Sequence, residues 1–174
     1  MEVFSMKFKK IERKDLQLNP IEMFADKWPL LTAGNEENGY NTMTIAWGHI
    51  GAVWNKPTIT IYVRPQRYTK EFIDHNELFT VSVLPPKYNK ALSYLGRTSG
   101  RDEDKIAKAG ITPAFAQDTT YFEEAELVFI CRKLYQDTIK EVGFLDQALM
   151  NKMYPEKDFH TMYVGEIVEI LVAE

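Results

Sequence analysis

Two hexapeptides of alternating polarity, residues 58–63 and 78–83, constrain the fold of this chain most. In each of them every second side chain is apolar and shares one face. A period of two residues is the property of a β-strand that packs one face against a core. The expected inward positions are Ile59, Ile61, Val63, Phe79, Val81 and Val83. The sequence therefore predicts at least two half-buried strands.

Further segments carry the same signal and extend the predicted sheet. We expect strands at residues 28–33, 41–47, 49–54, 126–135 and 160–172, with a hairpin turn at 34–39 and a break at Gly48. The two longest strands are expected to turn one set of side chains inward. These sets are Leu127, Phe129 and Cys131 in the first and Met162, Val164, Val168 and Ile170 in the second.

Helical signals are short and lie between the strands. One helix is expected from Pro86 to Leu95 with Gly96 past its end, and another near residues 144–153. A third follows Tyr68, with Thr69 as its cap and Phe72 and Ile73 towards the core. A fourth covers residues 102–109, capped by Asp102 and stopped by Gly110. Many strands with short helices at the corners predict a mainly β, antiparallel barrel, closed or split, rather than a βαβ array.

Length and composition narrow the class of protein. At roughly 150 residues per domain, 174 residues predict one domain spanning 1–174. The 21 basic and 25 acidic residues give a net charge of −4, which argues against a nucleic-acid-binding protein. No stretch approaches a membrane span and the first residues lack a signal-peptide core, so we expect a cytoplasmic protein without membrane contact. Three scattered histidines predict no metal site.

The common catalytic motifs are missing. The sequence has no GxGxxG, no GxxxxGK[ST], no GxSxG and no HExxH. The single cysteine, Cys131, stands among apolar strand residues, which is typical of a core position rather than of a nucleophile. It also excludes a disulfide framework and a cysteine-based zinc or iron–sulfur site. Hydrolytic and kinase chemistry therefore has little support.

Polar clusters at strand ends are the candidate site. They occupy residues 41–47, 64–69 and 97–102, with Lys105 one turn into the next helix. Arginines beside a helix start, and small hydroxyl residues beside a glycine, can bind an anion. Ordinary alternatives stay open: threonines favour strands, Trp47 can fill a core, the arginines can be solvated, and Ser99-Gly100 can be a plain turn. The residues alone predict a β-rich domain with a candidate phosphate site.

The chain resembles the flavin reductase-like family over nearly its whole length, from about Pro20 to Leu171. The resemblance lies in residues 41–48, 54–57, 64–69, 79–85, 98–105 and 160–167, which occur in the family's order. It implies an FMN-binding split β-barrel, a Greek-key antiparallel barrel with short flanking helices. It also implies a homodimer with one FMN per subunit near the dimer interface.

The resemblance also implies roles for particular residues. The flavin ring and ribityl chain would be lined by Asn41, Thr42, Met43, Thr44, Ala46 and Trp47. The ribityl-phosphate side would hold Arg64, Arg67, Tyr68 and Thr69. The remaining contacts, from the same or the partner subunit, would come from Ser99, Gly100, Arg101 and Lys105. His160 matches a histidine beside the flavin and nicotinamide, where its role would be hydrogen bonding and orientation in catalysis.

Several functions fit this resemblance. The leading expectation is an FMN-dependent oxidoreductase that moves electrons from NAD(P)H to flavin and on to an acceptor. The alternative is a flavoredoxin-type FMN electron carrier that is served by a redox protein and has no nicotinamide activity. A flavin-storage or sensing module, or a pyridoxamine-phosphate or haem-binding relative, stays open. Residues 143–157 form an insertion that would cover the flavin or contact the partner subunit.

Overall fold

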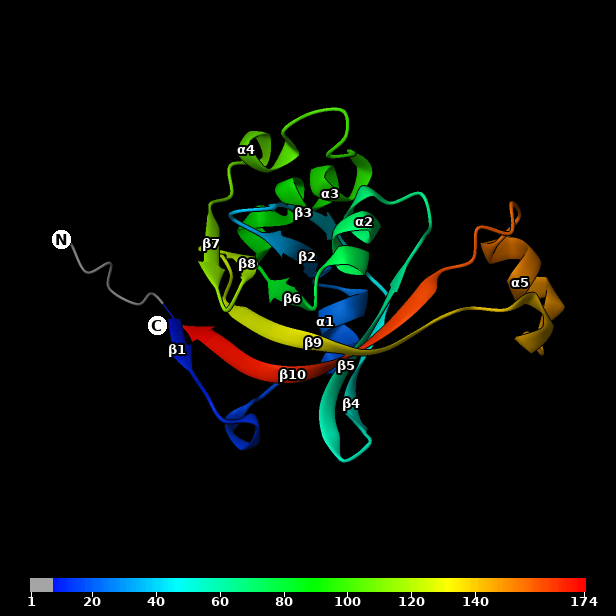
Figure 1. The fold of residues 1–174 in the computed structure, drawn as a ribbon, viewed down its shortest axis with the longest axis horizontal. Helices are drawn as coiled ribbons and strands as arrows, with labels where there is room; N and C mark the ends of the chain where they lie inside the picture. The colour runs from blue at the N-terminus through cyan, green and yellow to red at the C-terminus, as the bar shows by residue number, and fades with distance from the viewer. Residues whose placement is uncertain (1–7) are drawn as a thin grey trace.

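The computed structural model describes residues 8–174. The expectation that the first residues form no signal peptide falls in part on residues 1–7, which lie outside the described residues. Within residues 8–174, eight strands form one antiparallel sheet and two more form a separate hairpin (Figure 1). The sheet contains β1 (Phe8–Lys10), β2 (Leu30–Asn35), β3 (Gly39–Thr44), β4 (Gly48–Val53), β5 (Lys56–Val63), β6 (Leu78–Val83), β9 (Leu127–Thr138) and β10 (Thr161–Ala173). The hairpin pairs β7 (Pro113–Ala116) with β8 (Thr119–Phe122).

The order of the strands leaves a seam in the sheet. The path is β3-β2-β6-β9-β10-β5-β4, with β1 paired to β10. Strands β3 and β4 follow one another in the chain, yet they stand at opposite ends of this path. Residues 45–47 link them and belong to neither strand, whereas the sequence predicted one strand through Trp47. The seam therefore lies at Ile45, Ala46 and Trp47.

Five short helices lie around the sheet in the part of the chain that the structure describes. They are α1 (Pro20–Ala25), α2 (Tyr68–His75), α3 (Asn89–Arg97), α4 (Lys105–Ala109) and α5 (Gln147–Met153). Single 3₁₀ turns occupy Arg13–Asp15, Pro86–Tyr88 and Glu141–Gly143. Asn19 caps α1, accepting from the amides of Ile21 and Glu22, and Pro20 starts the helix with a φ that already suits it.

Three predicted helix ends are corrected by the structure. Gly96 lies inside α3 rather than beyond it, and Thr44 packs so closely there that a Cβ would be 3.2 Å away. The cap of α4 is Asp104, which accepts from the amide of Ala107, and not Asp102. Thr69 lies within α2, which follows Arg67. The predicted stop at Gly110 is confirmed, because its φ of 69° is the left-handed geometry that glycine adopts at little cost.

Two apolar clusters fill the two faces of the central strands. One is enclosed by the curl of the sheet and contains the predicted inward residues of β5 and β6. The other lies under α3, α4 and the β7–β8 hairpin (Figure 1). In β9, Phe129 belongs to the first cluster while Val128 and Ile130 belong to the second. This strand is buried on both faces, which explains its unbroken apolar run.

The predicted face of β10 is wrong because the strand is irregular. Its register against β9 shifts between Val164 and Gly165 and again between Ile167 and Glu169. Each shift changes which side chains share a face. As a result Ile170 lies in the first cluster, Val168 packs against the second, and Met162 and Val164 line a surface hollow.

The connection between β9 and β10 projects from the body of the protein. We call residues 139–160 the arm; it carries α5, which lies far from the barrel in Figure 1. Val142, Leu145 and Leu149 on it are exposed. Among the described residues no helix is long and apolar enough to cross a membrane.

Candidate functional site

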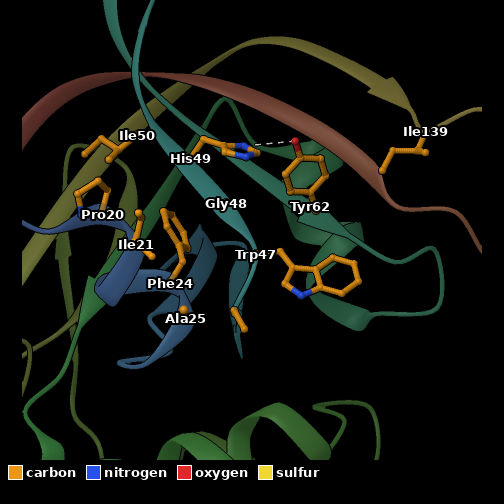
Figure 2. Close-up of a pocket in the computed structure, with 11 residues that line it drawn as sticks. Pro20, Ile21, Phe24, Ala25, Trp47, Gly48, His49, Ile50, Tyr62 and Ile139 are labelled. Carbon is orange, nitrogen blue, oxygen red and sulfur yellow. Dashed lines mark hydrogen bonds between the residues drawn. The ribbon is translucent and has the colours of Figure 1, made fainter. Parts of the chain in front are cut away.

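The seam opens into an apolar hollow, which we call the seam pocket. Its volume is about 590 Å³, and its lining comes from α1, from the link between β3 and β4, from β4 itself and from Tyr62 and Ile139 (Figure 2). Trp47 stands at its edge, and His49 lies 3.4 Å from the Tyr62 hydroxyl on the β4–β5 side. The lining residues are Pro20, Ile21, Phe24, Ala25, Ala46, Trp47, Gly48, His49, Ile50, Tyr62 and Ile139. A planar, weakly polar group suits such walls better than a phosphate.

A second hollow, the cationic cleft, has the opposite character. It has a volume of about 320 Å³ and lies at β3, the end of β5, the start of α2 and the α3–α4 connection. Four basic side chains line it and, among the described residues, no acidic side chain does. The lining residues are Asn41, Met43, Arg64, Gln66, Arg67, Tyr68, Thr69, Arg97, Thr98, Ser99 and Lys105. The donor set fits a dianionic phosphate.

Two of these cations are held by neutral partners. Arg67 Nη1 donates to the carbonyl of Gly96 at 2.7 Å. Lys105 is 3 % exposed, and its Nζ donates to the carbonyls of Leu95 and Thr98, both at 2.9 Å. Burial, with the Arg67 charge second, lowers the pKa of Lys105 to about 8. Burial, followed by the Arg64 charge, lowers the pKa of Arg67. Arg67 and Lys105 thus place two positive charges close together, and no carboxylate is among the described hydrogen-bond partners of either side chain. This arrangement suits an anion.

Arg64 connects the cleft to the arm. Its Nη1 pairs with Asp158 Oδ2 at 2.5 Å, and its Nη2 donates to the carbonyl of Met153 at 2.9 Å. The guanidinium also lies 5.0 Å from the centre of the Tyr154 ring, a distance typical of a cation–π contact. Gln66 donates to the same carboxylate oxygen at 2.9 Å.

His160 lies at the base of the arm and is buried. Its Nδ1 and the Tyr154 hydroxyl share a hydrogen bond of 2.8 Å, and its ring centre is 4.7 Å from that of Trp47. Burial, followed by the Arg64 charge, lowers its pKa to about 4. The imidazole is therefore uncharged near pH 7, where one ring nitrogen donates a hydrogen bond and the other accepts one. It can orient Trp47 and Tyr154.

Most of the predicted site residues gather around the cleft. Asn41 donates to Thr69 Oγ1 at 2.8 Å, which joins β3 to α2. Gly100 lies against this pair, since a Cβ on it would be 2.3 Å from Asn41 Oδ1. The cleft thereby brings together Asn41, Met43, Arg64, Arg67, Tyr68, Thr69, Ser99 and Lys105.

Other predicted residues lie elsewhere. Thr42 bonds to Thr32 and to the Leu31 carbonyl, and Thr44 donates to the Leu92 carbonyl, so neither side chain lines the cleft. Ala46 and Trp47 line the seam pocket. Arg101 lies over the Tyr68 ring and pairs with Glu71 on the surface. His160 lines neither the cleft nor the seam pocket.

Further residues join those to which the resemblance assigned a role. Gln66, Arg97 and Thr98 also line the cleft, and they belong to the predicted polar clusters 64–69 and 97–102. Tyr154 and Asp158 reach Arg64 from the arm, which no local pattern could show. The described residues hold no group of three or more His, Cys, Asp or Glu side chains able to bind a metal.

Comparison with known proteins settles the family. The model of the flavin reductase like domain matches residues 23–174. The chain belongs to the flavin reductase-like family. This makes it a flavin-related oxidoreductase domain and identifies its cofactor as a flavin. No curated protein matches the sequence significantly.

Solved structures agree with this family. Flavoredoxin of Desulfovibrio vulgaris (Miyazaki F) is similar, with a TM-score of 0.66 and 26 % identity, over 84 % of this chain and 69 % of that chain. Flavoredoxin from Methanosarcina acetivorans has a TM-score of 0.65 and 22 % identity, over 95 % and 76 % of the two chains. Nitrilotriacetate monooxygenase component B from Bacillus cereus has a TM-score of 0.65 and 18 % identity, over 91 % and 82 %. The predicted mainly β split-barrel fold is confirmed.

Proposed function

We propose that this flavin reductase-like protein binds FMN and transfers electrons from NAD(P)H through it to an acceptor. The observation that carries the proposal is the cationic cleft, where the buried Lys105 and the half-buried Arg67 lie beside Arg64 and donate to backbone carbonyls. Buried positive charge of this kind is costly unless an anion compensates for it. The phosphate of FMN is such an anion, and solved relatives are FMN-binding proteins by name.

In this proposal each hollow holds a different part of the cofactor. Arg64, Arg67, Thr69 and Lys105 hold the phosphate, with the first amides of α2 as further donors because α2 has no side-chain cap. Trp47 and the seam residues contact the flatter, less polar part, and the His160 ring packs against Trp47. Bound FMN would supply the electron-accepting and electron-donating chemistry.

The test is an anaerobic titration of purified protein loaded with FMN. The visible flavin band is recorded before and after addition of NADH, and separately of NADPH. Bleaching by either nucleotide supports the reductase function and names the donor. A protein that cannot be loaded with FMN would contradict the cofactor assignment.

A second candidate function is a flavoredoxin-type electron carrier. The seam pocket favours it, because none of its described lining residues is a lysine, an arginine or an acid. A nicotinamide dinucleotide brings phosphates that need cationic partners. The likeness to Desulfovibrio flavoredoxin at 26 % identity points the same way. A flavin band that persists under excess nicotinamide but bleaches with a reduced redox protein would select this function.

We also propose that the protein is a homodimer. The face around β4 carries exposed large apolar side chains, namely Ile21, Trp47, Val53 and Trp54. Strand β4 is also an end of the sheet path, with one edge free of a strand partner in the described structure. Exposed apolar surface beside a free edge is typical of an interface. Light scattering at micromolar concentration should give the dimer mass; a monomer would refute it.

A further inference from the structure

Among the described residues that line the cleft, Arg64 alone forms an ion pair with the arm, and its partner is Asp158. Nη1 forms an ion pair with Asp158 and Nη2 donates a hydrogen bond to the Met153 carbonyl, so residues of the arm fix the orientation of the guanidinium. A guanidinium has five N–H donors. Donors that these two contacts do not use can serve a ligand in the cleft.

Electrostatic repulsion from the neighbouring cations of the cleft favours orientations of Arg64 away from them, and the contacts with the arm oppose this repulsion. Arg64 and Arg67 line the same cleft, and burial, followed by the Arg64 charge, lowers the pKa of Arg67. Lys105 adds a third positive charge nearby. Asp158 supplies the opposing negative charge, and it is itself fixed by the amide of Gln66 at 2.9 Å. The carboxylate therefore keeps Arg64 beside Arg67 before any ligand arrives.

We propose that Asp158 is a positioning residue for the cofactor phosphate, which makes the base of the arm part of the FMN site. The inference rests on the proposed FMN binding and deepens it. Asp158 touches Arg64 and Gln66 and does not line the cleft. It acts by holding the guanidinium in the orientation in which its unused donors meet the phosphate, an effect of pre-organisation.

The test compares FMN with riboflavin, which lacks only the phosphate. Dissociation constants of both flavins are measured by fluorescence titration of apoprotein. The dissociation constant of riboflavin divided by that of FMN reports the contribution of the phosphate, and below it is called the ratio. In Asp158→Asn the ratio should fall about fivefold, and in Arg64→Met about tenfold, as expected for charge-assisted hydrogen bonds. Affinity for riboflavin should stay unchanged in both. Asp158→Glu should restore part of the ratio.

A double-mutant cycle separates positioning from a general structural effect. Because Asp158 acts through Arg64, the pair Arg64→Met with Asp158→Asn should bind FMN no more weakly than Arg64→Met alone. The matched control is Glu141→Gln, which removes an arm carboxylate that pairs with Lys157, away from the cleft. It should leave the ratio unchanged.

The outcomes are distinct. If Asp158→Asn raises the ratio, the carboxylate competes with the phosphate and the proposal is overturned; an unchanged ratio overturns it as well. Additive losses in the double variant also refute action through Arg64. If wild-type protein binds neither flavin, the proposed function itself fails. If it binds both equally, FMN binding stands and the phosphate role of Asp158 falls.

Discussion

The Tyr154 hydroxyl and His160 Nδ1 lie 2.8 Å apart in the interior, and the imidazole packs on Trp47 at the seam. Tyr154 comes from the arm, whereas Trp47 links the two ends of the sheet. The histidine therefore joins the arm to the seam. Its protonation would place a charge in a buried position beside the Arg64 cation.

This position predicts a loss of stability in acid. Burial lowers the pKa of His160 from 6.5 to about 4. The unfolded chain therefore takes up a proton that the folded protein refuses, and the free energy of unfolding falls as pH drops from 6.5 towards 4. The slope from one group is at most about 1.4 kcal/mol per pH unit. Urea unfolding of His160→Asn should lack this component, while His75→Asn on exposed α2 should retain it; equal slopes in His160→Asn and wild type would contradict the assignment.

Arg67 should contribute more to FMN binding than to folding. Arg67→Met removes a half-buried cation whose one described side-chain hydrogen bond is to the Gly96 carbonyl. We expect FMN affinity to fall by about 1.5–3 kcal/mol, the range for a hydrogen bond to a charged group. Riboflavin binding should change little. Calorimetric titration with both flavins measures this, and Arg132→Met, on a surface pair with Glu77, is the control. Equal losses for the two flavins would place the phosphate elsewhere.

Local patterns predicted the strands well, and long-range geometry explains the failures. Ile59, Ile61 and Val63 are fully buried as the alternation required, because regular strands keep a period of two. β10 broke this rule at two register shifts, of which the first is at Gly165, a residue type that often marks a bulge inside a strand. Gly96 lies within α3, where it leaves room for Thr44, a residue distant in sequence.

In the candidate site, too, local sequence patterns predicted some residues and long-range contacts determined the others. Arg64, Arg67 and Lys105 were predicted together and do line one cleft. The resemblance assigned Thr42 and Thr44 to the flavin ring and ribityl chain, but alternation along β3 turns their side chains to other partners. Tyr154 and Asp158 reach Arg64 across roughly ninety residues of chain, so no spacing in the sequence could reveal the contact.

Lys105 predicts a gain of stability in mild alkali. Burial lowers its pKa from 10.5 to about 8. Between these values the unfolded chain still holds the proton while the folded protein has released it, so this group makes stability rise with pH over that interval. Lys105→Met should lose the rise relative to wild type. Bound FMN should diminish it, because a phosphate favours the charged amine. Chemical unfolding at several pH values checks this; a wild-type-like rise in Lys105→Met would refute it.

Cys131 should be inert in the folded protein. Its side chain is fully buried in β9, and burial raises the pKa of the thiol. Thiolate is the reactive form, so neither access nor ionisation favours reaction. A chromogenic disulfide reagent should titrate no thiol in native protein and one after unfolding in urea. Rapid labelling without denaturant would show that this region of the sheet opens.

The contact between Gly100 and Asn41 predicts that a side chain at position 100, in the loop before α4, destabilises the protein. A Cβ at Gly100 would stand 2.3 Å from Asn41 Oδ1 and 3.2 Å from the Tyr68 ring. Gly100→Ala must therefore displace Asn41 from Thr69, and overpacking of this kind costs about 1–3 kcal/mol. FMN binding should weaken as well, because the same residues line the cleft. Gly51→Ala, with no neighbour within 4 Å of the added carbon, is the matched control for thermal unfolding and FMN titration. If both variants behave alike, Asn41 moves freely and the loop does not shape the site.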